Sequence, residues 1–282
     1  MLIRGPGSRK LCDRIAKEND DIEVVDVESK IFPDGEIYVR LEEDVEGEDC
    51  YLVQTTYPNR NLIELFFIQD ALVENGADSI TVIAPYYSYA RQDQIFESGE
   101  GLSARSIAKR LQIDAKSFYS VDLHSEKILD FFDIFSYNFS AMPLLADHSE
   151  VYDPDLFISP DEGGLERVKT AAEEVDIEWD YLEKTRIDGE TVEIRTKNIG
   201  VEGKTVVILD DIISTGGTMR EASKQLLDQG AEEVHAGCTH GLFVGDAMEK
   251  LDEVCDSIFC TDTIECEKTE VTVTPFIEEI ID

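Results

Sequence analysis

Basic residues are scarce in this 282-residue sequence, which has 25 lysines and arginines against 62 aspartates and glutamates, a formal net charge of −37 at pH 7. Nonspecific affinity for nucleic acid comes from lysine and arginine neutralising phosphates, so no nucleic-acid partner is expected. The acidic residues are spread along the whole chain. Self-repulsion of this size is screened by molar salt, which shortens the Debye length to about 3 Å. The composition favours a halophile-like, salt-adapted surface over an acidic partner-binding patch.

Long apolar runs and paired cysteine motifs are also lacking. No run approaches the roughly 18 apolar residues of a membrane span, and the first residues show no apolar signal core, so a cytoplasmic protein without a membrane partner is expected. The six cysteines, at positions 12, 50, 238, 255, 260 and 266, form no C-x-x-C pair. Neither a zinc knuckle nor a redox motif is therefore supported. Reduced structural thiols are expected, although Cys255, Cys260 and Cys266 leave room for a disulfide or an adventitious metal.

Short β-branched runs alternate with helical patterns along the chain. YLVQTT, SITVIAP, LFISP and KTVVILDD are typical of strands, and NLIELFFIQDALVENG and GTMREASKQLLDQG are typical of helices. This alternation predicts an α/β fold with a mainly parallel sheet. Long low-complexity or proline-rich linkers are absent from the sequence.

A weak internal repeat relates the two halves of the chain. ALVENGADSITVIAPYYSYA, near residue 80, is similar to QLLDQGAEEVHAGCTHGLFV, near residue 235. In each copy a glycine, Gly76 or Gly230, stands where a helix is expected to stop in a left-handed residue before an apolar strand. The repeat predicts two tandem units with a boundary near residues 140–152, which we place as domains 1–145 and 146–282. Chance similarity between two ordinary helix–strand joints is the alternative.

The segment 204–230 carries the clearest chemical signal. An apolar strand ends in Asp210 and Asp211, and Ser-Thr-Gly-Gly-Thr, residues 214–218, then opens a helix. Glycines let the backbone amides turn towards one point, and the helix N-terminus adds partial positive charge, so a phosphate is favoured there. No lysine lies inside the loop, which excludes a Walker-type nucleotide loop.

The two neighbouring carboxylates extend this site beyond a phosphate. Side chains at the carboxyl end of a strand of an open α/β sheet are well placed to bind ligands. Asp210 and Asp211 can accept hydrogen bonds from the vicinal hydroxyls of a sugar, or bind Mg²⁺ through water. Simple capping of the turn by these aspartates is the alternative.

The stretch VVILDDIISTGGT resembles the phosphoribosyl-binding loop shared by phosphoribosyltransferases and ribose-phosphate diphosphokinases. IFPDGEIYVR, YYSYARQDQ, VDLHSEK, ISPDEGGLERV and LEKTR then occur in the order expected of the diphosphokinases, over nearly the full length, with the archaeal-type branch fitting best. The resemblance implies two tandem phosphoribosyltransferase-like domains. It also implies transfer of the diphosphoryl group of ATP to the 1-hydroxyl of ribose 5-phosphate, giving phosphoribosyl diphosphate and AMP for nucleotide biosynthesis.

The resemblance also assigns residues to roles. It implies ATP binding by Phe32, Asp34, Glu36, Arg91 and Gln92; Mg²⁺ binding by His124 and Asp161; a catalytic pair, Lys184 and Arg186; and ribose 5-phosphate binding by Asp210, Asp211, Ser214, Thr215, Gly216, Gly217 and Thr218. The adenine contacts are expected to reach a neighbouring subunit, which implies a homo-oligomer, a dimer or larger. Read alone, residues 33–35 make a plain turn, Arg91 suits a surface salt bridge, and Lys184 and Arg186 suit a solvated strand edge.

Some features depart from the family or leave alternatives open. Residues 92–111 are polar and glycine-bearing in their first half, and we expect them to form a flap that excludes water. Gln94 stands where many relatives carry a basic residue, and Glu126 replaces a commonly neutral one. A phosphoribosyltransferase and a catalytically silent homologue are the competing hypotheses, and the Arg-Gln-Asp and Asp-Leu-His segments disfavour the first.

Overall fold

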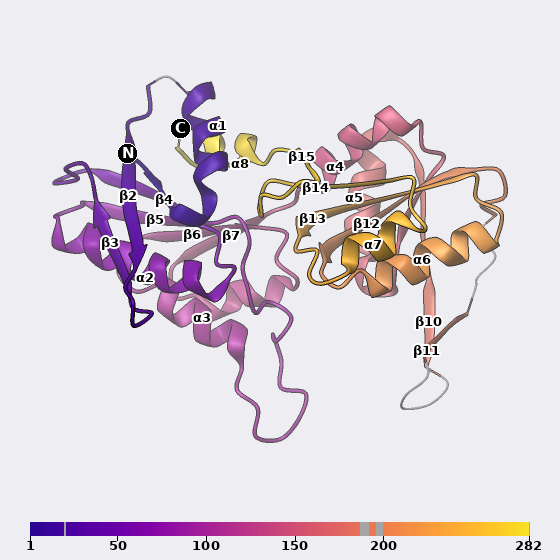
Figure 1. Ribbon diagram of the computed structural model, residues 1–282, viewed down its shortest axis with the longest axis horizontal. Coiled ribbons are helices and arrows are strands. Elements are labelled where there is room, and N and C mark those ends of the chain that lie inside the picture. The colour runs from indigo at the N-terminus through magenta and orange to yellow at the C-terminus, as the bar shows by residue number, and fades with distance from the viewer. Residues whose placement is uncertain (20, 187–191, 196–199, 282) are drawn as a thin grey trace. The chain divides into compact units, whose positions relative to one another are not determined.

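The computed structural model describes residues 1–19, 21–186, 192–195 and 200–281, without the side chains of 183–186 and 192–195. The chain forms two compact units (Figure 1). The first contains Met1–Phe139, Thr263–Glu265 and Val273–Asp282, and the second contains Ser140–Asp262 and Cys266–Thr272. The sequence predicts a single boundary after residue 145. It does not predict that two C-terminal segments belong to the first unit.

The first unit is built on a seven-stranded sheet in the order β3-β2-β1-β4-β5-β6-β7. Only the β2–β3 pair is antiparallel. The strands are β1 (Leu2–Arg4), β2 (Val24–Ile31), β3 (Ile37–Leu41), β4 (Asp49–Val53), β5 (Ser79–Ala84), β6 (Ser117–Val121) and β7 (Phe135–Phe139). The helices are α1 (Arg9–Glu18), α2 (Asn59–Glu74), α3 (Ser103–Leu111) and α8 (Thr274–Ile281).

The apolar faces of these helices explain where they lie. Leu65, Ile68 and Leu72 of α2 are fully buried in the core beneath the central strands. Helix α8 packs on α1, and the ring of Phe276 stacks on Phe139 at 5.0 Å between centroids. Burial of this apolar surface is the main term that stabilises the unit.

The second unit has a six-stranded, fully parallel sheet in the order β15-β14-β13-β12-β8-β9. Its strands are β8 (Leu156–Ser159), β9 (Glu178–Tyr181), β12 (Thr205–Ile213), β13 (Glu233–Gly241), β14 (Ser257–Thr261) and β15 (Thr269–Val271). A separate antiparallel pair is formed by β10 (Glu183–Arg186) and β11 (Val192–Arg195). The helices are α4 (Met142–Ser149), α5 (Leu165–Val175), α6 (Gly217–Asp228) and α7 (Ala247–Asp252).

Alternation along β12 places one core on each face of this sheet. Ile208 belongs to a cluster with residues of α6, whereas Leu209 belongs to a cluster with residues of α4 and α5. A parallel sheet buried on both faces produces the continuous apolar run VVIL that the sequence shows. The expected class, two mainly parallel sheets flanked by helices, is confirmed.

The internal repeat appears as shared topology. The order β2-β1-β4-β5-β6-β7 matches β9-β8-β12-β13-β14-β15 position for position. Gly76 and Gly230 have φ of 79° and 93°, as a left-handed helix stop requires. Each of these glycines accepts a 2.8 Å hydrogen bond at its carbonyl oxygen, from the amides of Gly47 and Gly203 respectively. Within the described part of the chain, no helix is long and apolar enough to cross a membrane.

Candidate functional site

The predicted phosphate loop lies between β12 and α6 in the second unit. Strand β12 runs to Ile213, which pairs with Gly241 of β13. Asp210 and Asp211 therefore lie inside the strand, whereas the sequence pattern predicts them at its end. The ladder to β13 continues past the aspartates because Ile212 and Ile213 are apolar and buried. The loop itself is residues 214–216, and α6 begins at Gly217.

The backbone of this loop is fixed on its inner side. The Ser214 carbonyl accepts a 3.0 Å hydrogen bond from the amide of Val244. Gly216 has φ of 73°, and a Cβ built there would lie 3.2 Å from the carbonyl oxygen of Ala247. Only glycine suits both the left-handed conformation and this close approach. Thr215, Gly217 and Thr218 are exposed, so the outer face of the helix N-terminus is open to an anion.

The two aspartates are held by each other and by an arginine that the sequence analysis did not single out. Asp211 is 3% exposed, and its Oδ2 lies 3.3 Å from Nη2 of Arg167 on α5. The Asp211 amide donates a 2.9 Å hydrogen bond to Oδ1 of Asp210. Burial, and next the negative charge of Asp211, raise the pKa of Asp210 well above its usual range, while Arg167 opposes the shift. Arg167 is therefore the counter-cation of a crowded carboxylate pair.

Asp161 organises the turn that follows the neighbouring strand β8. Its Oδ1 accepts a 3.0 Å hydrogen bond from the amide of Gly163, and its carbonyl accepts a 2.6 Å hydrogen bond from Oγ of Ser159. A Cβ on Gly164 would lie 2.4 Å from that same Ser159 Oγ, so a side chain there would displace the Ser159 hydroxyl from this hydrogen bond. Because β8 and β12 are adjacent and parallel, Asp161 and the Asp210–Asp211 pair lie at the same edge of the sheet.

The predicted catalytic cations lie on the antiparallel pair. Lys184 and Arg186 belong to β10, opposite Ile194 and Val192 of β11. Alternate residues of a strand project to the same face. Their side chains lie outside the residues whose side chains the structure describes, so their joint role stays a prediction.

In the first unit, the predicted adenine-binding residues form the tip of the β2–β3 hairpin. The Phe32 amide donates to the carbonyl of Glu36 at 2.8 Å, and the Glu36 amide donates to Oδ1 of Asp34 at 3.1 Å. Gly35, with φ of 94°, closes the turn. Phe32 is 41% exposed, and its ring is in edge contact with Tyr38 at 6.1 Å between centroids. An exposed aromatic ring on a tight turn is available for stacking on a ligand.

The remaining first-unit residues follow the parallel strands β5 and β6. Arg91 is exposed after β5, and His124 is exposed just after β6. Gln92 instead holds the start of α3, because its carbonyl accepts a 3.2 Å hydrogen bond from the Ala104 amide and its Oε1 accepts one from the Ser103 hydroxyl. Glu126, a departure from the family, accepts a 2.6 Å hydrogen bond from Nδ2 of Asn138.

The expected flap, residues 92–111, contains a helix in its second half. Helix α3 buries Ala104, Ala108 and Leu111 in the core, which anchors this half. Residues 92–102 have no helix or strand, and the amides of Phe96 and Glu97 donate to Oε2 of Glu100 at 2.8 and 3.1 Å. A water-excluding flap is therefore a prediction for residues 92–102 alone.

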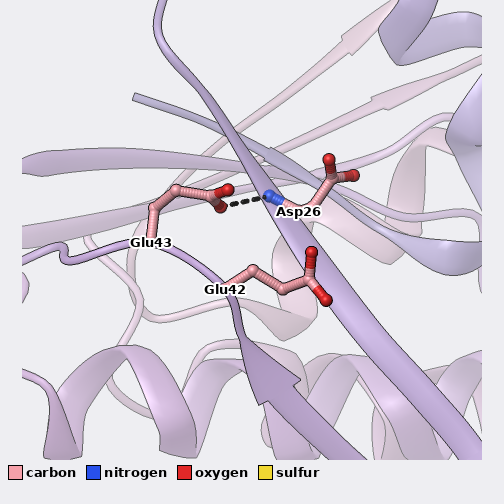
Figure 2. A group of neighbouring side chains, drawn as sticks. All are labelled: Asp26, Glu42 and Glu43. Atoms are coloured by element: carbon pink, nitrogen blue, oxygen red, sulfur yellow. Dashed lines mark hydrogen bonds between the residues drawn. The ribbon is translucent and has the colours of Figure 1, made fainter.

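A separate acidic group lies on β2 and just after β3. Carboxylate oxygens of Asp26, Glu42 and Glu43 lie within 4.8 Å of one another (Figure 2). Glu43 accepts a 2.7 Å hydrogen bond from the Asp26 amide, and Oδ1 of Asp26 is 3.5 Å from Nη1 of Arg4. The group thus has cationic and backbone partners of its own, and it includes none of the predicted metal ligands, His124 and Asp161.

Comparison with known proteins gives one family along the whole chain. Residues 1–113 match the N-terminal domain of ribose phosphate pyrophosphokinase, and residues 139–276 match the phosphoribosyl transferase domain. The chain is 38% identical to a ribose-phosphate pyrophosphokinase of Methanothermobacter thermautotrophicus, over 100% of this chain and 99% of the relative. It is 41% identical to ribose-phosphate pyrophosphokinase 2 of Archaeoglobus fulgidus, over 99% of each.

A solved structure agrees with these relatives. The crystal structure of phosphoribosylpyrophosphate synthetase from Mycobacterium smegmatis matches with a TM-score of 0.88 and 32% identity, covering 100% of this chain and 97% of that one. Both the fold and the sequence thus match from end to end. The chain belongs to the ribose-phosphate pyrophosphokinase family, also called ribose-phosphate diphosphokinases, and its archaeal relatives fit the archaeal-type branch that the motifs indicated.

Proposed function

We propose that this chain transfers the diphosphoryl group of ATP to the 1-hydroxyl of ribose 5-phosphate through two sets of side chains, one on each unit. The single observation that supports this most is the second-unit site. There, the N-terminus of α6, which starts at Gly217, follows a pair of neighbouring carboxyl groups, the half-buried Asp210 and the buried Asp211, and Arg167 is the cation beside Asp211. A group that binds a phosphate, next to carboxyl groups that accept hydrogen bonds from hydroxyls, suits a sugar phosphate.

The loop binds the 5-phosphate in this proposal. The amides and hydroxyls of residues 214–218 donate to the phosphate oxygens, because the N-terminus of α6 favours an anion. Asp210 and Asp211 accept hydrogen bonds from the ribose 2- and 3-hydroxyls. The fixed loop lowers the entropic cost of orienting the sugar, which raises the rate of a reaction that depends on alignment.

ATP is bound by the first unit. Phe32 stacks on the adenine, Asp34 and Glu36 accept hydrogen bonds from it, and Arg91 and Gln92 contact the remainder of the nucleotide. Because the hairpin tip is exposed, we propose that it serves the site of a second copy, so that the working form is a homo-oligomer. Since ATP and sugar phosphates are metabolites of the cell interior, we also propose a cytoplasmic location.

Mg²⁺ fits the donor chemistry of this chain. Asp161 offers the carboxylate oxygen that Mg²⁺ prefers, and His124 would hold the ion directly or through water. When bound, Mg²⁺ neutralises charge on the ATP phosphates. Asp161 lies on the turn after β8, where its carboxylate also accepts a hydrogen bond from the Gly163 amide.

The transfer itself needs alignment and charge neutralisation more than covalent help. The ribose 1-hydroxyl attacks the β-phosphorus in line, and AMP leaves. Lys184, Arg186 and Arg91 stabilise negative charge on the transferring group. Removing one such contact commonly costs 10²–10³-fold in rate, so we expect Lys184→Ala and Arg186→Ala to lower kcat by about that factor or less. Activity within a few-fold of wild type would remove either residue from this role.

The decisive test is AMP release from ATP with and without ribose 5-phosphate, in molar KCl with Mg²⁺, with the sugar product identified by mass. Sugar-dependent AMP together with phosphoribosyl diphosphate is the expected result. If folded protein gives neither, nucleobases are tried with phosphoribosyl diphosphate, because consumption of that compound would support a phosphoribosyltransferase and its absence a silent homologue.

A further inference from the structure

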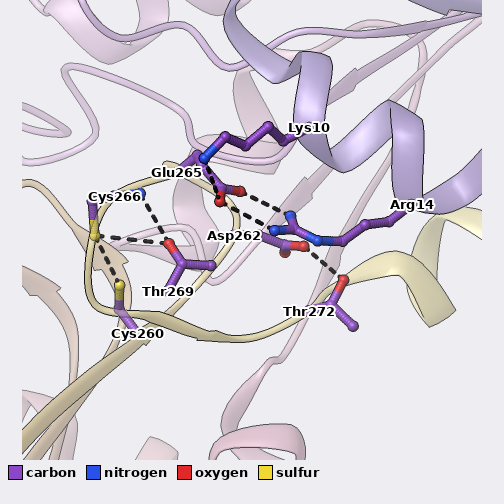
Figure 3. Close-up of polar contacts among 8 residues, drawn as sticks. All are labelled: Lys10, Arg14, Cys260, Asp262, Glu265, Cys266, Thr269 and Thr272. Carbon is purple, nitrogen blue, oxygen red and sulfur yellow. Dashed lines mark hydrogen bonds and ion pairs between the residues drawn. The ribbon is translucent and has the colours of Figure 1, made fainter.

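Two cysteines that the proposed reaction does not use face each other in the second unit. Cys260 is in β14 and fully buried, and Cys266 precedes β15 and is partly exposed. Their Sγ atoms are 3.4 Å apart (Figure 3). A disulfide has an S–S distance of about 2.05 Å, so the sulfurs need to approach by only about 1.4 Å.

The backbone around the pair is already folded into a closed turn. The Cys260 amide donates to the Lys268 carbonyl at 2.9 Å, and the Cys266 amide donates to Oγ1 of Thr269 at 2.9 Å. Cys260 and Thr269 are register partners in the sheet, and the register shifts directly after Cys260. The two thiols are therefore held together by the fold, with a local irregularity that can absorb a small movement.

The two sulfurs differ in access. Cys266 can be reached from solvent, whereas Cys260 is enclosed. The hydrogen bond with Cys266, and next burial, raise the pKa of Cys260 far above that of an ordinary thiol. Cys255, also partly exposed, has a different partner, since its Sγ lies 3.2 Å from Oγ of Ser223. Oxidant is thus expected to meet Cys266 first.

We propose that Cys260 and Cys266 form a reversible oxidation site, with a peroxide as the oxidant. Cys266 loses its proton to become a thiolate, which attacks one oxygen of hydrogen peroxide. The O–O bond breaks and the released hydroxide takes up that proton, so that a sulfenic acid and water result. The Cys260 sulfur then attacks the Cys266 sulfur, its proton leaves with the departing hydroxide as a second water, and the S–S bond forms. Two thiols are oxidised by two electrons, and one peroxide is reduced to two waters.

The disulfide would close a ring around residues 261–265, a segment whose acidic side chains already form polar contacts. Between the cysteines, Glu265 binds Arg14 of α1 at 2.8 and 3.1 Å and Lys10 at 3.2 Å. Asp262 accepts a 2.6 Å hydrogen bond from the Thr272 hydroxyl (Figure 3). Closing a covalent ring around residues 261–265 restricts this segment in the unfolded chain, which stabilises the folded one.

The positions of the aspartates allow each of these cysteines to be identified by peptide mapping. Cleavage before Asp256 and Asp262 puts Cys255, Cys260 and Cys266 on three different peptides. Reduced full-length protein in molar KCl is treated with hydrogen peroxide, blocked with iodoacetamide and digested without reductant. The expected result is a linked pair of the Cys260 and Cys266 peptides, lighter by two hydrogen atoms than their sum, that separates with dithiothreitol. The thermal midpoint is expected to rise by about 5 °C on oxidation and return on reduction.

Variants sharpen the assignment. In Cys260→Ser, dimedone should trap a sulfenic acid on Cys266, and Cys255→Ser, the matched control, should form the bond like wild type. Unlinked Cys260 and Cys266 peptides after peroxide treatment of the folded wild type, or a link to Cys255, would overturn the proposal. The wild-type map needs no variant, so a folding defect in Cys260→Ser leaves the test intact.

Discussion

At the scale of single residues, the pairing of Asp211 with Arg167 decides how the sugar site is built. A carboxylate that is almost fully buried needs a partner, because an unpaired buried charge is strongly destabilising. The sequence predicted Asp210 and Asp211 through the strand-then-glycine pattern. It did not predict Arg167, because a cation in the helical stretch LERVKTAAEEV resembles any solvated helix charge. Only the adjacency of β8 and β12, which the chain order does not reveal, brings α5 against the aspartates.

Arg167→Met should therefore lower the free energy of unfolding by about 3 kcal/mol, since it leaves Asp211 without its cation. It should also raise the KM for ribose 5-phosphate more than the KM for ATP, because the disturbed carboxylates face the sugar. Denaturant unfolding and steady-state kinetics measure both. Arg167→Lys should recover part of each loss, and Lys169→Met, on the same helix and in an ion pair with exposed Glu173, is the matched control.

The raised pKa of Asp210 gives a pH dependence with a definite sign. The folded state keeps this proton at pH values where the unfolded carboxyl, near 4, has lost it, so stability falls as pH rises from about 4 through the raised pKa. Asp210→Asn removes the fall. At pH 7 the variant should exceed wild type in unfolding free energy, and the difference should shrink towards pH 4.

Asp246→Asn tests a dependence of stability on pH that has the opposite sign. An ion pair with Lys250 lowers the pKa of Asp246, so its contribution to stability is present at neutral pH and lost as pH falls through the lowered pKa. Unfolding free energies of the three proteins between pH 3 and pH 8 provide the comparison. Parallel curves for wild type and Asp210→Asn would mean that the Asp210 carboxyl is not perturbed in solution.

At the scale of elements, the sequence predicts which helices and strands exist better than it predicts the residues at which they begin and end. Patterns of β-branched and apolar residues predicted β5, β8, β12 and both long helices. The sequence pattern ends β12 two residues early, at Asp211, because acidic residues normally mark a strand end, whereas the ladder to β13 continues through Ile213. The sequence pattern includes helix α3 in the flap, because the buried face of this helix relies on Ala104 and Ala108, which carry little apolar signal.

Gly216 is the element-scale position where one methyl group should matter. Gly216→Ala forces a left-handed alanine, which costs about 1–2 kcal/mol, and crowds the Ala247 carbonyl. We expect a matching loss of unfolding free energy and a weaker affinity for ribose 5-phosphate by isothermal titration. Gly217→Ala is the stability control, because its Cβ would meet nothing nearer than 3.9 Å. Equal stability of the two variants would contradict the steric role given to Gly216.

At the scale of the whole molecule, the repeat in the sequence correctly indicated two α/β units. A short similarity around Gly76 and Gly230 sufficed, because the helix stop and the following strand recur at equivalent places in both sheets. The return of residues 273–282 to the first unit could not be predicted, since the only sign is an apolar helix whose partner, α1, lies at the other end of the chain. The formal charge of −37 still predicts a stability that depends on molar salt.

Co-expression of two inactive variants can test whether an active site is shared between two copies of the chain. Phe32→Ala removes the hairpin-tip ring and Arg186→Ala removes a predicted catalytic cation, so each variant alone should have little activity. If the tip serves a second copy, a mixed dimer contains one site with neither lesion, and co-expression at equal levels should give about a quarter of wild-type AMP release. If the tip serves its own chain, every site keeps a lesion, and the co-expressed protein should be no more active than the average of the two variants.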